Sequence, residues 1–341
     1  MCSVAAADRR SAYYLDKKEI TSEKRSAALS DVQHTYRKRA IRKGVTSEIV
    51  IQLAALQSPL EKKYRHTLIC GNDMKICVDN DSGEERYNTE YCGNRWCTVC
   101  TNRRSSQMQS AYADALKAMK NPYFVTLTIV SVPIEYDAIV DSYNYMQDVF
   151  RKIKDSMRKQ GVQLSGIRKF EVNYNVSEQT CNPHYHVLID GFSAAHTLRG
   201  LWMEHIPGLD WRANKVQKTK KSTLKELFKY TTKQVSKEAE EFIPEYLDTI
   251  YQALQGRRTL QNFGSFKKSS VSAQNDAEEL HISSEEISSQ KGNWEVVDVF
   301  RWNPHRFNWV NSRGDHFVPD LTAEETYNAR KLRKQRMQLL H

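Results

Sequence analysis

Two short segments of this chain carry side chains that together could act on a phosphodiester. In residues 182–189, His184 and His186 are separated by one residue, so on a β-strand both imidazoles point to the same face. Glu226 and Tyr230 are four residues apart, so on a helix the carboxylate and the phenol share one face. Two imidazoles can hold a divalent cation, and a tyrosine beside that cation can attack a phosphodiester. The two segments together predict a DNA-nicking enzyme.

A carboxylate on a neighbouring segment is a candidate third ligand of the cation. Glu171 lies on a segment that we expect to pair with the histidine strand. Imidazole and carboxylate ligands suit Mn²⁺, tolerate Mg²⁺ and leave positions open for phosphate oxygens. Taken singly, an isolated His-x-His is more often incidental, and Glu171 would be a solvated strand residue. The hypothesis therefore depends on the three side chains as a set.

The surroundings of Tyr230 distinguish it from the other tyrosines of the chain. A phenol is a weak nucleophile at neutral pH and needs cationic groups nearby. Lys229 is adjacent to Tyr230 and Lys233 follows three residues later, on a helix that we predict over residues 222–240. Taken alone, the same segment is explained better as an amphipathic helix with exposed ion pairs.

Cysteines at metal-ligand spacing precede these segments. Cys92, Cys97 and Cys100 include a Cys-x₂-Cys pair, and with one further thiol they predict a closed structural Zn²⁺ site. The fourth thiol could come from Cys70 or from Cys77. Free buried thiols are the weaker alternative.

The overall charge favours a polyanionic partner. The 341 residues carry a formal net charge of +10, and Lys and Arg contacts to phosphate dominate nucleic-acid affinity. Arg103 and Arg104 follow the cysteines directly and are candidate DNA contacts. No apolar run approaches the roughly 20 residues needed to cross a bilayer, and the N-terminus lacks a signal-peptide core. We therefore expect a cytoplasmic protein with no membrane association, whose cysteines serve metal binding.

Strand-like and helix-like segments alternate around the candidate ligands. Helical periodicity marks residues 134–160 and 194–205. Apolar and β-branched residues predict strands over residues 123–132, 166–176, 184–192 and 211–216. This order predicts an α+β fold with a central antiparallel sheet and flanking helices, not a doubly wound parallel sheet.

Composition divides the chain into five regions. A Ser-, Glu- and Gln-rich stretch with few large apolar residues is typical of a linker. The regions are a basic helical N-terminal region (1–66), a zinc-binding region with its connecting helix (67–120), an endonuclease domain (121–268), the linker (269–292), and an aromatic and basic C-terminal region (293–341).

The ordered motifs resemble those of the replication initiator (Rep) proteins of small rolling-circle plasmids, within the HUH endonuclease superfamily. Residues 124–128 are similar to the first motif of that family and residues 183–188 to the second. Residues 226–233 are similar to the third, in the single-tyrosine form in which a glutamate accompanies the nucleophile. Residues 92–104 are similar to the cysteine-arginine signature that precedes the nuclease domain, although Thr98 stands where the family commonly has proline.

The resemblance implies an HUH nuclease fold and a division of roles among the candidate residues. Tyr230 would form a 5′-phosphotyrosine, Glu226 would later act as general base, and Lys233 would neutralise charge on the phosphate. The cation would be Mn²⁺ or Mg²⁺ on Glu171, His184 and His186. Cys70, which precedes a glycine as in relatives, would complete the structural Zn²⁺ site.

The resemblance also implies partners and leaves other functions open. The substrate would be single-stranded or hairpin origin DNA, and a host helicase with the replication machinery would be needed because the chain has no phosphate-binding loop. A transposase or mobilisation relaxase would share the nuclease fold. A non-enzymatic, zinc-containing nucleic-acid-binding protein would keep the cysteines and the charge but would not need Tyr230.

Overall fold

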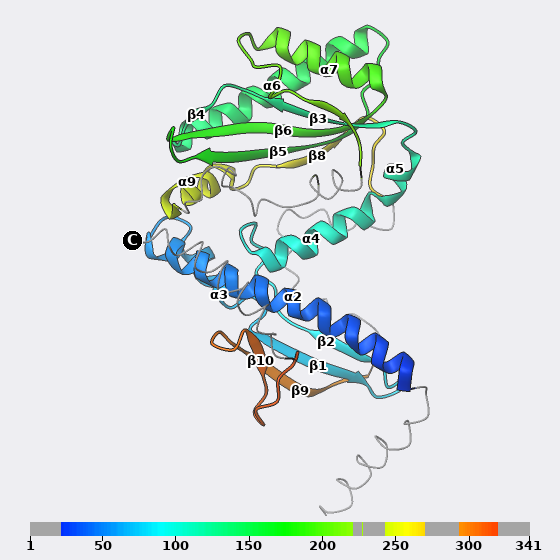
Figure 1. Ribbon diagram of the computed structural model, residues 1–341, viewed down its shortest axis with the longest axis vertical. Coiled ribbons are helices and arrows are strands. Elements are labelled where there is room, and N and C mark those ends of the chain that lie inside the picture. The colour runs from blue at the N-terminus through cyan, green and yellow to red at the C-terminus, as the bar shows by residue number, and fades with distance from the viewer. Residues whose placement is uncertain (1–21, 221–226, 228–242, 270–292, 320–341) are drawn as a thin grey trace, which may run out of the picture.

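The computed structural model describes residues 22–220, 227, 243–269 and 293–319. Within these residues the chain is a mixed α+β structure with two antiparallel sheets and flanking helices (Figure 1). The α+β class and the antiparallel arrangement expected from the sequence are confirmed. No helix in the described ranges is both long enough and apolar enough to cross a membrane.

The larger sheet contains the predicted strands of the histidine segment. Its strand order is β7-β3-β6-β5-β8, with β4 pairing beside β6, and every pair is antiparallel. The strands are β3 (Pro122–Thr128), β4 (Val132–Pro133), β5 (Gly166–Asn175), β6 (Thr180–Asp190), β7 (Val216–Lys218) and β8 (Leu260–Phe263).

The two faces of this sheet differ because successive side chains of a strand alternate between them. Helices α6 (Tyr136–Lys159) and α7 (Phe192–His205) cover one face, above the sheet in Figure 1. There Val125, Tyr185 and Val187 join the main apolar core. The alternate residues of the same strands point to the opposite face, and among them are His184, His186 and Glu171.

The smaller sheet joins two distant parts of the chain. Its order is β10-β9-β1-β2, formed by β1 (Asp73–Asp79), β2 (Glu85–Asn88), β9 (Trp294–Asn303) and β10 (Asn308–Val310). Asp73 pairs with Arg301 and Asp79 pairs with Trp294. The aromatic segment near the C-terminus, which composition placed in a region of its own, therefore completes a sheet with the segment that precedes the cysteines.

A long helix, α2 (Ser22–Ala55), runs between the two sheets (Figure 1). Ala40 of this helix packs with Met74 and Trp309 of the smaller sheet, whereas Val50 and Leu53 belong to the main core. The remaining helices are α3 (Glu61–Leu68), α4 (Thr98–Ala111), α5 (Ala113–Ala118) and α9 (Pro244–Leu254). Helix α2 thus connects the two sheets through apolar contacts of its middle part and of its C-terminal part.

The strands predicted over residues 123–132 and 211–216 are shorter in the structure. The first ends at Thr128, and only Val132–Pro133 pair again, as β4. Residues 211–215 form no strand, and β7 begins only at Val216, because Asn214 ties the preceding loop to β3. Its side chain accepts a hydrogen bond from the Thr128 backbone N–H at 2.8 Å and donates one to the Thr128 hydroxyl at 3.1 Å. The predicted helix over residues 222–240 lies outside the described residues, apart from Leu227.

Candidate metal and nuclease site

Polar side chains occupy two neighbouring positions across the three central strands of the larger sheet. Glu171 of β5 is paired with His184 of β6, which is paired in turn with Thr128 of β3. One step along the strands, Lys169 of β5 and Thr126 of β3 flank His186. Directly paired residues of antiparallel strands point to the same face, so the three predicted ligands meet there.

The ligand atoms lie at distances that suit one common cation. Glu171 Oε2 is 3.5 Å from His184 Nε2 and 3.3 Å from His186 Nε2, and the three ligand atoms lie within 4.8 Å of one another. Two ligands bound at right angles to one ion at about 2.1–2.2 Å would be about 3 Å apart. The residues present therefore fit a divalent cation with two imidazole ligands and one carboxylate ligand.

Hydrogen bonds hold both imidazoles with Nε2 toward the carboxylate. Nδ1 of His184 is 3.0 Å from the Asn182 carbonyl oxygen, and Nδ1 of His186 is 3.4 Å from the Thr126 hydroxyl. The ring of Phe124 stacks against His186 with centroids 5.1 Å apart. A hydrogen bond at one ring nitrogen leaves the other free to bind a metal. Both rings are thus oriented before any cation arrives.

The electrostatics of the cluster favour the protonation states of metal ligands. Burial raises the pKa of the Glu171 carboxyl, but the Lys169 ammonium and hydrogen bonds from the two imidazoles outweigh it, and the pKa lies well below its usual value. Burial lowers the pKa of His186. An ionised carboxylate and a neutral imidazole are the forms that bind cations.

Lys169 is a member of this cluster that the sequence reasoning missed. Its side chain is 4% exposed and forms an ion pair with Glu171 Oε1. The available signal was its position two residues before Glu171, which places both side chains on one face of a strand.

The predicted catalytic residues of the third motif, Glu226, Tyr230 and Lys233, lie outside the described residues. The same holds for Lys229, a predicted DNA contact. Leu227, within the same motif, is described and is fully buried. It packs in a cluster with Phe124, Ile167 and Leu188, together with Tyr112 and Phe266. Phe124 and Leu188 are paired across β3 and β6, on the face that carries the histidines.

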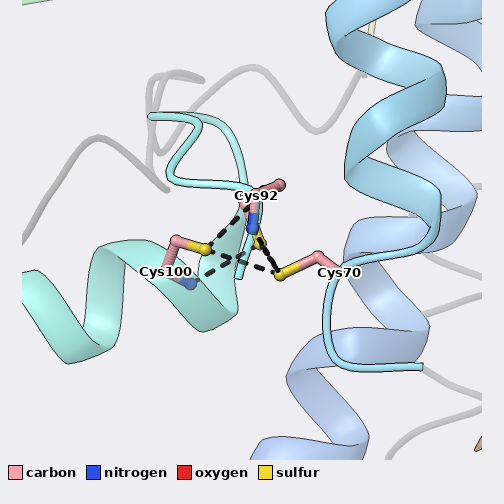
Figure 2. Close-up of side chains that lie close together, drawn as sticks. Cys70, Cys92 and Cys100 are labelled. Carbon is pink, nitrogen blue, oxygen red and sulfur yellow. Dashed lines mark hydrogen bonds between the residues drawn. The ribbon is translucent and has the colours of Figure 1, made fainter. Parts of the chain in front are cut away.

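Four buried cysteines form a second cluster, between α3 and α4 (Figure 2). The Sγ atom of Cys70 is 3.5 Å from that of Cys100 and 3.6 Å from that of Cys97, and the Sγ atoms of Cys92 and Cys100 are 3.6 Å apart. Tetrahedral zinc with Zn–S bonds of about 2.3 Å requires sulfur atoms about 3.8 Å apart. The four thiols therefore fit a zinc ion, and they are too far apart for disulfide bonds.

Of the two candidates for the fourth position, Cys70 lies beside the other three cysteines and Cys77 does not. Cys77 lies on β1 and its sulfur accepts a hydrogen bond from Asn88, whereas Cys70 joins the cluster. Backbone N–H groups of Cys92 and Cys100 point at the sulfur atoms of Cys70 and Cys97, at 3.4 Å and 3.5 Å. Hydrogen bonds to its sulfur lower the pKa of Cys70; the largest effect comes from the Cys100 thiol, and the Cys92 backbone N–H also contributes.

A buried lysine connects the cysteine cluster to helix α2. Lys43 donates a hydrogen bond to the Cys70 carbonyl oxygen at 2.6 Å, and its ammonium lies 5.4 Å from the centre of the Trp302 ring. Burial lowers the pKa of Lys43 to about 8. The cluster is therefore tied both to α2 and to the C-terminal strand β9.

The two arginines expected to contact DNA have different environments. Arg104 is buried and donates to the Gly93 carbonyl oxygen at 3.0 Å, so it braces the loop between the cysteines. Arg103 is half-buried and its guanidinium lies 4.3 Å from the centre of the Tyr91 ring. Of the pair, Arg103 is the one whose side chain remains partly open to a ligand.

Comparisons with known proteins agree with the motifs. A family model described as "Replication protein" matches residues 84–191, which include β5, β6 and three of the clustered cysteines. A "Protein rep" of Streptococcus pneumoniae is 27% identical over 238 residues, which are 61% of this chain and 72% of that protein. A "Protein rep" of Staphylococcus aureus is 25% identical over 173 residues, covering 47% of this chain and 76% of that protein. No solved structure gives a significant match. These matches confirm the resemblance that the ordered motifs indicated, to the replication initiator proteins of rolling-circle plasmids.

Proposed function

We propose that this chain is a site-specific single-strand DNA endonuclease and strand-transferase that nicks a plasmid origin to start rolling-circle replication. The observation that carries the proposal is the meeting of Glu171, His184 and His186 on one sheet face within a chain similar to replication proteins. The net charge of +10 suits a DNA substrate.

The three clustered side chains would hold Mn²⁺ or Mg²⁺, and the cation would supply polarisation and orientation of the scissile phosphate. Tyr230 would attack that phosphorus with its phenolic oxygen. The new bond is Tyr230 Oη–P, and the bond that breaks is P–O3′. The tyrosine loses its proton and the leaving 3′ oxygen gains one, which leaves a 5′-phosphotyrosyl protein and a 3′-hydroxyl that a polymerase can extend.

Leu227 supports the approach of Tyr230 to the cluster. It is buried in the apolar cluster that includes Phe124 and Leu188, and Phe124 stacks on the ligand His186. Tyr230 follows Leu227 by three positions, a chain length of at most about 10 Å. From this anchor the phenol would be able to reach a phosphate bound at the cluster.

The other residues of the third motif would serve the same reaction. Glu226 would act as general base for a water molecule at termination, so that the second cleavage releases DNA. Lys233, and with it Lys229, would stabilise charge that develops on the phosphate oxygens.

The cysteine cluster would hold a structural Zn²⁺ that fixes α3, α4 and the loop between them. Arg103 would then contact a phosphate from a rigid position. Because the chain has no nucleoside-triphosphate loop, duplex unwinding would depend on a host helicase and the replication machinery.

The comparisons favour a replication initiator over a transposase or a relaxase, because the family description and the relatives' names are those of replication proteins. A purely structural zinc protein would leave the clustered set of Glu171, His184 and His186 without a role.

Cation-dependent nicking of a supercoiled plasmid that carries the origin tests the proposal. Chelation should abolish conversion to the open circle and added Mn²⁺ should restore it. His186→Gln should reduce conversion by about 100-fold or more. His205→Gln, an exposed histidine on α7, is the matched control and should leave conversion unchanged. Nicking that survives both chelation and His186→Gln refutes the proposed centre.

A further inference from the structure

Lys169 is a buried cation placed among the ligands of a cation site. It lies on β5 directly opposite His186 on β6, and its side chain is almost completely buried. Lysine is almost never fully buried unless it is paired. Lys169 forms an ion pair with Glu171, itself a member of the ligand set.

The Glu171 carboxylate divides its two oxygens between two kinds of partner. Oε1 is in contact with the Lys169 ammonium, whereas Oε2 is 3.5 Å from His184 Nε2 and 3.3 Å from His186 Nε2. Lys169 therefore occupies one oxygen and leaves the other facing the imidazoles. A cation bound among the imidazoles and Oε2 would share this carboxylate with the lysine.

The charges of the cluster do not favour binding of a divalent cation in the absence of a DNA phosphate. Among the described residues of the cluster, the charges of Lys169 and Glu171 sum to zero, and metal-binding imidazoles are neutral. A divalent cation would therefore add uncompensated positive charge beside the Lys169 ammonium, and like charges a few ångströms apart repel strongly in a partly dehydrated site. The negative charge of a DNA phosphodiester bound at the cation would reduce this repulsion.

We propose that Lys169 is a positioning residue whose positive charge weakens cation binding to the free protein, so that the cation binds tightly only together with a DNA phosphate. This inference rests on the proposed function, because it assumes that Glu171, His184 and His186 hold the cation. Its consequence is a centre that is assembled by its substrate, which limits cleavage to DNA already seated in the site.

Two variants separate this role of charge from a purely structural one. Lys169→Met removes the charge while keeping an unbranched side chain, and Lys169→Arg keeps the charge. Both are made with Tyr230→Phe, so that no covalent product forms, in full-length protein loaded with Zn²⁺. Thermal unfolding checks that each variant folds.

The measurement is Mn²⁺ binding at pH 8, followed by loss of the free-ion electron paramagnetic resonance signal, with and without oligothymidylate as the phosphodiester probe. Lys169→Met should bind Mn²⁺ about tenfold more tightly than its parent without the oligonucleotide, and the gain on adding the oligonucleotide should shrink. Lys169→Arg should behave as its parent does.

Equal or weaker Mn²⁺ binding by folded Lys169→Met overturns the inference, because a residue that only holds Glu171 in place would lower affinity when it is removed. Glu171→Gln reports separately on the proposed centre and should lose Mn²⁺ binding. If the parent protein binds no Mn²⁺ even with the oligonucleotide, the centre itself is refuted, and the role of Lys169 with it.

Discussion

Truncation of Leu227 should slow DNA cleavage without weakening the metal centre. Leu227 is fully buried against Phe124, Ile167 and Leu188. Replacing a buried leucine by alanine costs about 2–5 kcal/mol, from lost transfer free energy and the cavity left behind. Each 1.4 kcal/mol changes an equilibrium tenfold. A loss of about 3 kcal/mol would therefore lower the docked fraction of the Tyr230 segment by up to about 150-fold.

The assay measures the rate at which a single-stranded origin oligonucleotide becomes covalently attached to the protein in the presence of Mn²⁺. Leu227→Ala should reduce this rate by about 10- to 100-fold, while Mn²⁺ affinity changes less than about twofold. Leu116→Ala is the matched control, because Leu116 packs against the same apolar cluster from α5. It should lower stability but not the rate. A normal rate in Leu227→Ala, or an equal loss in both variants, refutes the anchoring role.

Three further outcomes are expected. Cys97→Ser should lose bound zinc in metal analysis of the purified protein. Cys77 is a buried thiol outside the cluster, so Cys77→Ser should keep its zinc. Equal zinc content in the two variants would contradict the proposed zinc site. Asp248→Ala should lower the free energy of unfolding by about 1–3 kcal/mol in a denaturant titration, because Asp248 accepts hydrogen bonds from two hydroxyls and an amide. The control variant Thr249→Ala should change the free energy of unfolding little. The pKa of Glu171 is lower in the folded protein than its unfolded value of about 4.5. The Glu171 charge therefore stabilises the fold above pH 4.5, and this stabilisation is lost as the pH falls through the pKa of the folded state. In the presence of chelator, Glu171→Gln should reduce the loss of unfolding free energy at acidic pH. An unchanged dependence of unfolding free energy on pH would contradict the ion pair with Lys169.

The sequence predicted the candidate cation site because its geometry depends on local rules. The spacing of His184 and His186 places both on one face of any strand, and the short turn between the two strands sets the pairing of Glu171 with His184. Lys169 was missed although it obeys the same rule. A lysine on a strand is usually solvated, and its burial becomes evident only when the neighbouring strands are in place.

Other features depend on contacts between distant residues. The pairing of β9 with β1 joins Trp294 to Asp79, and no local pattern links segments so far apart. The choice of Cys70 over Cys77 was likewise open from spacing alone, because both precede the other cysteines at similar separations. The strand expected over residues 211–216 failed because Asn214 binds the backbone and hydroxyl of Thr128, a tertiary contact that overrides local preference.

The most direct test of the central claim is covalent attachment of DNA to the protein. Wild-type protein incubated with a single-stranded origin oligonucleotide and Mn²⁺ should yield a denaturant-resistant protein–DNA band, and peptide mapping should locate the DNA on Tyr230. Tyr230→Phe should abolish the band, whereas Glu226→Ala should retain it and slow its release. An adduct that persists in Tyr230→Phe, or that maps to another tyrosine, would contradict the account.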